Sequence, residues 1–120
     1  MANENISDVV REGRSLGGPA PGLVGVYGRL RIEVAGKPVG TLVIDGPRVA
    51  LTPDTTGPSD ACILCADDES FRTLLKGELN PFVASMRGLA RIKGDRNFGT
   101  KVMLGLRAGS PFTNQMEKGA

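Results

Sequence analysis

Between Leu23 and Val34, the even-numbered positions are apolar except for Gly28. One set would share a single face of a strand: Val24, Val26, Leu30, Ile32 and Val34. The residues that alternate with them would share the other face: Tyr27, Arg29, Arg31 and Glu33. Because successive side chains of a strand point to opposite faces, this pattern predicts a long strand buried on one side only, as in antiparallel sheets.

Short turns connect this strand to two more. AGKP (35–38) and Gly46-Pro47 are turn sequences, and they separate the apolar stretches 39–45 and 48–52. Connections this short predict that the three strands form an antiparallel meander.

A polar loop at 53–60 leads into the continuously apolar stretch 60–66, which predicts a fourth and central strand. This stretch contains a CxxC pair, Cys62 and Cys65. Such a pair can be a redox or metal motif. Residues three apart on a strand point to opposite faces, however, so we favour two small core residues over a paired site.

Two helices are predicted after this strand. Asp67 or Asp68 can cap the first helix, and Gly77 ends it. Its apolar positions are Phe71, Leu74 and Leu75. Asn80-Pro81 starts the second helix and Gly88 ends it, because Asn caps helices well and Pro is tolerated at the first helical position. The apolar positions of this second helix are Phe82, Val83 and Met86.

A fifth strand (89–93) and a final helix complete the predicted fold. Asp95 can cap this helix, whose apolar residues recur at helical spacing: Phe98, Val102, Met103 and Leu106. Four strands followed by helices indicate an α+β fold, in which helices pack on one face of a five-stranded, mostly antiparallel sheet.

The two ends of the chain carry weaker patterns. Residues 4–13 have the spacing of a short amphipathic helix, and GGPAPG (17–22) is typical of a loop or linker. We therefore expect an N-terminal arm at 1–22, a folded domain at 23–108 and a flexible tail at 109–120.

Composition excludes several functions. The chain has no His, which removes Ser-His, Cys-His and His-metal chemistry. Its net charge of +2 and its few aromatic residues argue against a nucleic-acid partner. No apolar run approaches the roughly 20 residues of a membrane span, and the first residues lack the pattern of a secretory signal. We expect a cytoplasmic protein.

The motifs over residues 60–106 resemble, in their order, the sterol carrier protein type two family. They are the strand ACILC, the acidic helix start 67–69, Lys76-Gly77, Asn80-Pro81, Gly88, Lys93-Gly94-Asp95 and the helix from Phe98 to Leu106. The resemblance implies an apolar tunnel between sheet and helices that takes sterols, fatty acyl chains, acyl-CoA or phospholipids. We expect no cofactor.

The apolar helix residues would line that tunnel: Phe71, Leu74, Leu75, Phe82, Met86, Phe98, Val102, Met103 and Leu106. The same residues could equally form a filled core. The hypothesis that follows is a non-enzymatic lipid carrier. The alternative is an accessory module of the same fold, which forms a homodimer or binds a partner enzyme.

Two further features allow opposing interpretations. Basic residues cluster around the second helix and the fifth strand: Arg87, Arg91, Lys93, Arg96 and Lys101. They could attract anionic lipid head groups, although a solvated surface is the more common role. Gly99 and Gly105 weaken the last helix by about 1 kcal/mol each relative to Ala, which predicts a movable lid, stiffened by Ala unless the glycines pack closely.

Overall fold

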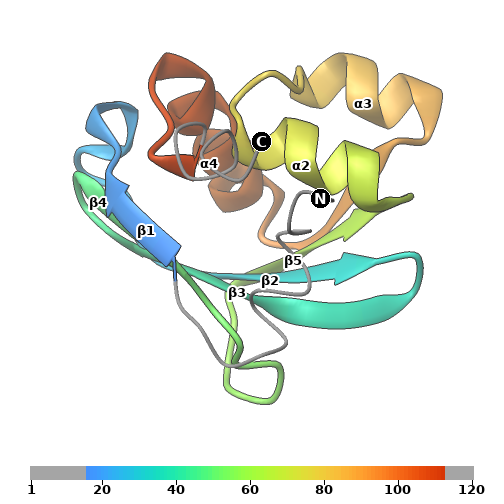
Figure 1. Ribbon diagram of the computed structural model, residues 1–120, viewed down its shortest axis with the longest axis horizontal. Coiled ribbons are helices and arrows are strands. Elements are labelled where there is room, and N and C mark those ends of the chain that lie inside the picture. Colours follow the sequence, from blue (N-terminus) through green and yellow to red (C-terminus); the bar gives the residue numbers. More distant parts are fainter. Residues whose placement is uncertain (1–15, 113–120) are drawn as a thin grey trace, which may run out of the picture.

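The computed structural model describes residues 16–112, which form a sheet with helices on one face (Figure 1). The strands are β1 (Leu16–Pro19), β2 (Tyr27–Val34), β3 (Lys37–Asp45), β4 (Arg48–Thr52), β5 (Ala61–Cys65) and β6 (Ala90–Gly94). The helices are α2 (Asp68–Leu75), α3 (Pro81–Arg87), α4 (Arg96–Ala108) and a short 3-10 helix, η1 (Pro21–Leu23). The predicted α+β class is confirmed.

The sheet has six strands in the order β1-β4-β3-β2-β5-β6. The predicted meander is β2-β3-β4, in which neighbours pair antiparallel. β5 then crosses over to pair parallel with β2, and β6 pairs antiparallel with β5. The sheet is therefore mixed, with a single parallel pair at β2 and β5.

β1 corrects the prediction of a loop at 17–22. Leu16–Pro19 pairs antiparallel with β4, in the register Leu16↔Leu51. The strand has no apolar alternation because small residues bring it close to its neighbour. A Cβ on Gly17 would overlap the Val49 carbonyl oxygen and lie 2.8 Å from Ala50 Cα. Close backbone approach gives no hydrophobic pattern, so this strand cannot be predicted from the sequence pattern.

β2 starts later than the alternation predicts. It begins at Tyr27, and Val24 lies before it with 69% of its surface exposed. Gly25, with φ of +84°, turns the chain between them, and an L side chain rarely adopts that conformation. From Leu30 onward the prediction is confirmed, since Leu30, Ile32 and Val34 are all buried.

The core lies between the inner face of the sheet and the helices. Cross-strand register aligns Leu30 with Leu42 and Leu42 with Leu51, and all three are fully buried. Fully burying one such side chain stabilises the fold by about 1.5–3 kcal/mol. α2 and α4 contribute Phe71, Leu74, Leu75, Val102, Met103 and Leu106 to the same cluster.

The helix starts follow the predicted capping chemistry. Asp67 Oδ1 accepts the Ser70 N–H at 2.8 Å, and Asp95 Oδ1 accepts the Phe98 N–H at 3.0 Å. Asn80 Oδ1 accepts two N–H groups, from Phe82 at 2.9 Å and Val83 at 3.2 Å. Each cap satisfies amide groups that the first turn of a helix leaves without a partner.

The face that α3 buries differs from the prediction. Phe82 and Met86 are 67% and 86% exposed, and Val83 is also exposed. The helix buries Pro81 and Ala84 instead. α3 has only seven residues, which is too short for a long apolar stripe. Its cap and its connection to the following strand therefore determine which side of the helix faces the core.

The last helix is anchored through its glycines. A Cβ on Gly105 would overlap Leu23 Cδ2 and lie 2.9 Å from the Gly22 carbonyl oxygen. A Cβ on Gly99 would lie 2.7 Å from Ile92 Cγ2. Both glycines are needed for close packing. Replacing them with Ala is therefore not expected to stiffen the helix.

The chain remains packed just beyond α4, where a flexible tail was expected from Gly109. The Ser110 hydroxyl donates a hydrogen bond to the Leu75 carbonyl oxygen. Phe112 is fully buried, and its N–H donates to Ser110 Oγ at 3.1 Å. The helix expected at 4–13 and the tail beyond Phe112 lie outside the described residues, and the domain limits remain a prediction.

Candidate functional site

Seven of the nine predicted lining residues meet in one apolar layer. All seven are buried and come from α2 and α4: Phe71, Leu74, Leu75, Phe98, Val102, Met103 and Leu106. They belong to one core cluster with the inward-facing residues of the sheet, which include Leu30 and Leu42. The arrangement can surround an apolar molecule only if these side chains move apart.

Phe82 and Met86, the other two predicted lining residues, lie on the exposed side of α3. The structure does not bring them together with the buried seven. Phe82 instead lines a groove of about 730 Å³ between α3, β6 and the start of α4.

This groove combines apolar and basic side chains. Phe82 and Ile92 line it together with three cations, Arg91, Lys93 and Arg96. Its lining contains no Asp or Glu. The structure thus brings together three members of the predicted basic cluster, while Arg87 and Lys101 do not line the groove.

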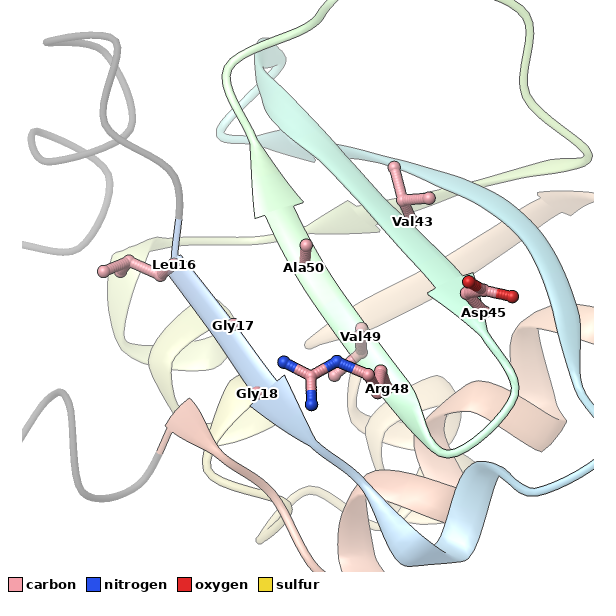
Figure 2. Close-up of a pocket in the computed structure, with 8 residues that line it drawn as sticks. All are labelled: Leu16, Gly17, Gly18, Val43, Asp45, Arg48, Val49 and Ala50. Atoms are coloured by element: carbon pink, nitrogen blue, oxygen red, sulfur yellow. The ribbon is translucent and has the colours of Figure 1, made fainter.

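A second depression, of about 440 Å³, lies at the other edge of the sheet (Figure 2). It spans β1, β4 and β3, and its lining includes Leu16, Val43, Asp45, Arg48 and Ala50. The Arg48 side chain extends from β4 toward β1 in Figure 2. The sequence carries no signal for this depression, because it depends on the pairing of β1 with β4.

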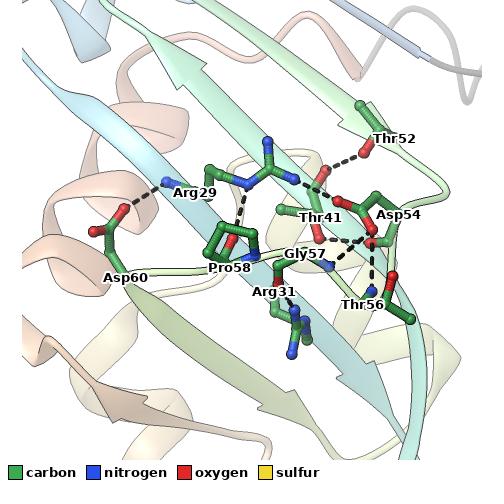
Figure 3. A network of polar contacts seen from close by, with 9 residues as sticks. All are labelled: Arg29, Arg31, Thr41, Thr52, Asp54, Thr56, Gly57, Pro58 and Asp60. Atoms are coloured by element: carbon green, nitrogen blue, oxygen red, sulfur yellow. Dashed lines mark hydrogen bonds and ion pairs between the residues drawn. The ribbon is translucent and has the colours of Figure 1, made fainter.

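Loop 53–60 folds over the outer face of the sheet (Figure 3). Arg29 Nη2 forms an ion pair of 2.5 Å with Asp54 Oδ2, and its Nε donates to the Pro58 carbonyl at 2.8 Å. Arg31 donates to the Gly57 carbonyl. Both arginines of the predicted polar face therefore hold this loop.

Asp54 organises the loop from within. Its Oδ1 accepts the N–H groups of Thr56 and Gly57, each at 3.0 Å. These backbone hydrogen bonds, and the nearby Arg29 guanidinium, hold the pKa of the Asp54 carboxyl below its usual value. The Asp54 carbonyl accepts the hydroxyl of Thr41 at 2.6 Å, which buries Thr41 beneath the loop. This network attaches the loop to β2 and β3 through Arg29, Arg31 and Thr41.

The two cysteines lie on opposite faces of β5, as predicted, and both are free thiols. Burial, with smaller effects of Asp67 and Cys62, raises the pKa of Cys65 to about 12. Partial burial raises the pKa of Cys62 too, and the Glu33 carboxylate nearby adds to the effect. Neither cysteine is a thiolate near neutral pH, so neither is an activated nucleophile.

Residues 16–112 contain neither a cluster of metal-binding side chains nor a helix that could cross a membrane. They hold no group of three or more His, Cys, Asp or Glu side chains arranged to bind a metal ion. In the same part of the chain, none of the helices combines the length and the apolar character needed to cross a membrane.

Several solved structures are similar to this chain. A protein described as UbiJ-SCP2, a ubiquinone synthesis protein, has 19% identity and a TM-score of 0.53, and the match covers 72% of this chain and 73% of that one. The sterol carrier protein domain 2 of Helicoverpa armigera has 25% identity and a TM-score of 0.48, over 69% and 68% of the two chains. Sterol carrier protein 2 of Yarrowia lipolytica, in its apo form, has 18% identity and a TM-score of 0.47, over 67% and 66%.

Family membership rests on the sequence match. No curated protein sequence gave a significant match to the chain. The model of the SCP-2 sterol transfer family matches residues 20–106, which include every strand from β2 to β6, helices α2 and α3, and α4 as far as Leu106. This match agrees with the resemblance that the motifs indicated, and the chain belongs to the SCP-2 sterol transfer family.

Proposed function

We propose that this protein is a non-enzymatic lipid carrier that works in the cytoplasm. It would hold one apolar molecule between the inner face of the sheet and the helices: a sterol, a fatty acyl chain, acyl-CoA or a phospholipid. The observation that carries the proposal is membership of the SCP-2 sterol transfer family over residues 20–106. The continuous apolar layer beneath α2 and α4 supports it.

The chemistry of that layer suits the apolar part of such a ligand. Thr41 and Ser70 are the only buried polar residues among those described, and Thr41 lies on the outer face under loop 53–60. A lipid chain that enters the layer would displace side chains, and the flexible thioether of Met103 adapts to such changes more readily than a branched residue.

The expected affinity is moderate. Burying a 16-carbon chain gains about 12 kcal/mol, at about 0.8 kcal/mol per CH₂ group. Association and ordering cost at least about 4–6 kcal/mol. The difference corresponds to a Kd of roughly 1 to tens of micromolar, which allows a carrier both to load and to release its cargo.

Two measurements test the proposal. Native mass spectrometry of the purified protein should reveal a co-purified lipid by its mass. A fluorescent fatty acid should bind at one site and be displaced by natural lipids. Met103→Ala should weaken this binding, while Leu104→Ala should leave it unchanged, because Leu104 is the next residue of α4 but points outward with 45% exposure. The proposal fails if none of these lipid classes displaces the probe.

A second candidate function is an accessory module that acts by association. The exposed apolar residues of α3 favour it, because large apolar side chains on a surface often mark an interface. The module would form a homodimer or bind a partner enzyme. Light scattering over a concentration series tests the homodimer, and a strict monomer at high concentration would contradict it.

A further inference from the structure

One continuous surface of the molecule combines exposed apolar groups with unpaired cations. We name it the α3–β6 surface, and it consists of Phe82, Met86, Arg91, Ile92, Lys93 and Arg96. Phe82 and Met86 are four residues apart on α3, so they project from the same side of that helix. Phe82 also lines the groove to which Arg91, Lys93 and Arg96 contribute.

The charge of this surface is not neutralised locally. Among residues 16–112, no carboxylate lies within ion-pair distance of Arg91, Lys93 or Arg96, and all three are exposed. Arg29 lies on the same outer face of the sheet as Arg91 and Lys93, but it differs from them because it is paired with Asp54. A set of exposed cations without acidic partners attracts an anionic surface.

The position of the surface leaves it accessible. β6 is the last strand of the sheet, so one of its edges has no neighbouring strand in the described structure. α3 stands beside that edge, with its outer side away from the core (Figure 1). The apolar groups therefore project from a rim of the molecule, with basic groups next to them.

We propose that the α3–β6 surface docks on the anionic face of a lipid bilayer. Phe82 and Met86 would insert at the level of the head groups, while Arg91, Lys93 and Arg96 would contact lipid phosphates. Apolar side chains flanked by cations are the recurring pattern of surfaces that bind in the membrane interface. This docking rests on the proposed function, because a carrier must meet a bilayer to load and release lipid.

The charge distribution disfavours a second copy of the chain as the occupant. In a twofold dimer the same patch lies on both subunits, so the cations of one copy would lie against the like-charged patch of the other. Like charges brought together across an interface oppose association. An anionic bilayer complements all three cations at once.

Vesicle co-sedimentation tests the proposal on the full chain. The protein should bind vesicles that contain phosphatidylglycerol more tightly than vesicles of phosphatidylcholine alone, and high salt should weaken that binding. Arg91→Gln with Lys93→Gln should lower the affinity by roughly 25-fold, since each cation near an anionic surface contributes about five-fold. The control Lys37→Gln with Arg107→Gln removes the same net charge from exposed positions elsewhere and should change the affinity by less than about two-fold.

A second pair of variants tests the apolar side chains of the α3–β6 surface. Phe82→Ser with Met86→Ser should also weaken vesicle binding, whereas Val24→Ser with Leu104→Ser, at other exposed apolar positions, should not. The proposal is overturned if the wild-type protein ignores phosphatidylglycerol, or if test and control variants lose affinity equally. It is also overturned if Phe82→Ser with Met86→Ser turns a dimer into a monomer while vesicle binding persists.

A solution assay separates this proposal from the proposed function. The arginine and lysine variants should still bind the fluorescent fatty acid in the absence of vesicles, because their side chains lie outside the apolar layer. Fatty-acid binding without vesicle binding would refute docking and leave the carrier function standing. Vesicle binding without any displaceable lipid would refute the carrier function and leave docking standing.

Discussion

The helices α3 and α4 start in the same way and end up in opposite environments. Each begins at a side-chain cap, Asn80 for α3 and Asp95 for α4. α4 then buries its large apolar residues against the sheet and η1. α3 buries Pro81 and Ala84 and exposes its large apolar residues to solvent.

The difference shows which signal decides a helix's orientation. α4 has 13 residues, long enough for Phe98, Val102 and Leu106 to form a stripe over several turns. α3 has seven residues, held between the Asn80 cap and the left-handed Gly88 that leads to β6. Local signals determine where both helices begin and end. A long apolar stripe can also determine which side of a helix faces the core, whereas in a short helix the connections at its two ends do so.

Truncation of a large side chain should give the largest difference in stability between variants of the two helices. Leu106→Ala in α4 should lower the free energy of unfolding by about 2–5 kcal/mol, because it removes buried methyl groups and leaves a cavity. Met86→Ala in α3 should change it by less than about 0.5 kcal/mol, since Met86 is exposed. Urea denaturation of both variants measures the difference, and equal losses would mean that α3 packs against something in solution.

A second comparison between the two helices uses substitutions at small residues. Gly105→Ala should destabilise the protein by about 1–3 kcal/mol, because the new methyl group would collide with Leu23 and the Gly22 backbone. Intrinsic propensity alone would favour Ala by about 1 kcal/mol. Ser85→Ala, at an exposed position of α3, should be neutral or slightly stabilising. Thermal unfolding decides the sign, and a stabilised Gly105→Ala would show that α4 is loosely held.

Much of the fold was predictable because local chemistry specifies it. The alternation in β2, the short turns of the meander and the three helix caps each act over a few residues, and the structure contains them all. β1 was not predictable in this way. Its pairing with β4 depends on the close approach of glycine backbones, and glycine carries no hydrophobic pattern.

The candidate site was predictable in part for the same reason. The apolar residues of α2 and α4 are buried as their helical spacing predicts, although spacing cannot distinguish a filled core from a lipid site. The grouping of Arg91, Lys93 and Arg96 with Phe82 required the structure, because it depends on how α3 sits beside β6. Loop 53–60 over Arg29 and Arg31 likewise depends on contacts between distant residues.

β5 also has a covered face and an open face. Burial of Cys65 on the covered face should make the stability of the protein depend on pH. The pKa of Cys65, on the covered face, is raised to about 12 from 9.0. Below pH 9 the thiol is protonated in both states and contributes no dependence on pH. Above pH 9 the unfolded chain loses the proton first, so stability should fall toward pH 12. Between pH 8 and pH 10 this thiol should remove about 1.4 kcal/mol, and Cys65→Ala should lack that part of the decline in denaturation curves.

The smallest expected effect concerns the caps, which the two helices share. Asn80→Ala and Asp95→Ala each remove acceptors of first-turn N–H groups, at a cost of about 0.5–1 kcal/mol. α4 should remain protected from hydrogen exchange after Asp95→Ala, because its buried stripe and the contact of Gly105 with Leu23 hold it in place. α3 should exchange faster after Asn80→Ala, because it buries only Pro81 and Ala84 and depends more on its cap. Asn80→Ser should restore protection, since Ser caps a helix almost as well as Asn. Faster exchange in α4 than in α3 would reverse this order, and would support the lid that the glycine content of α4 first suggested.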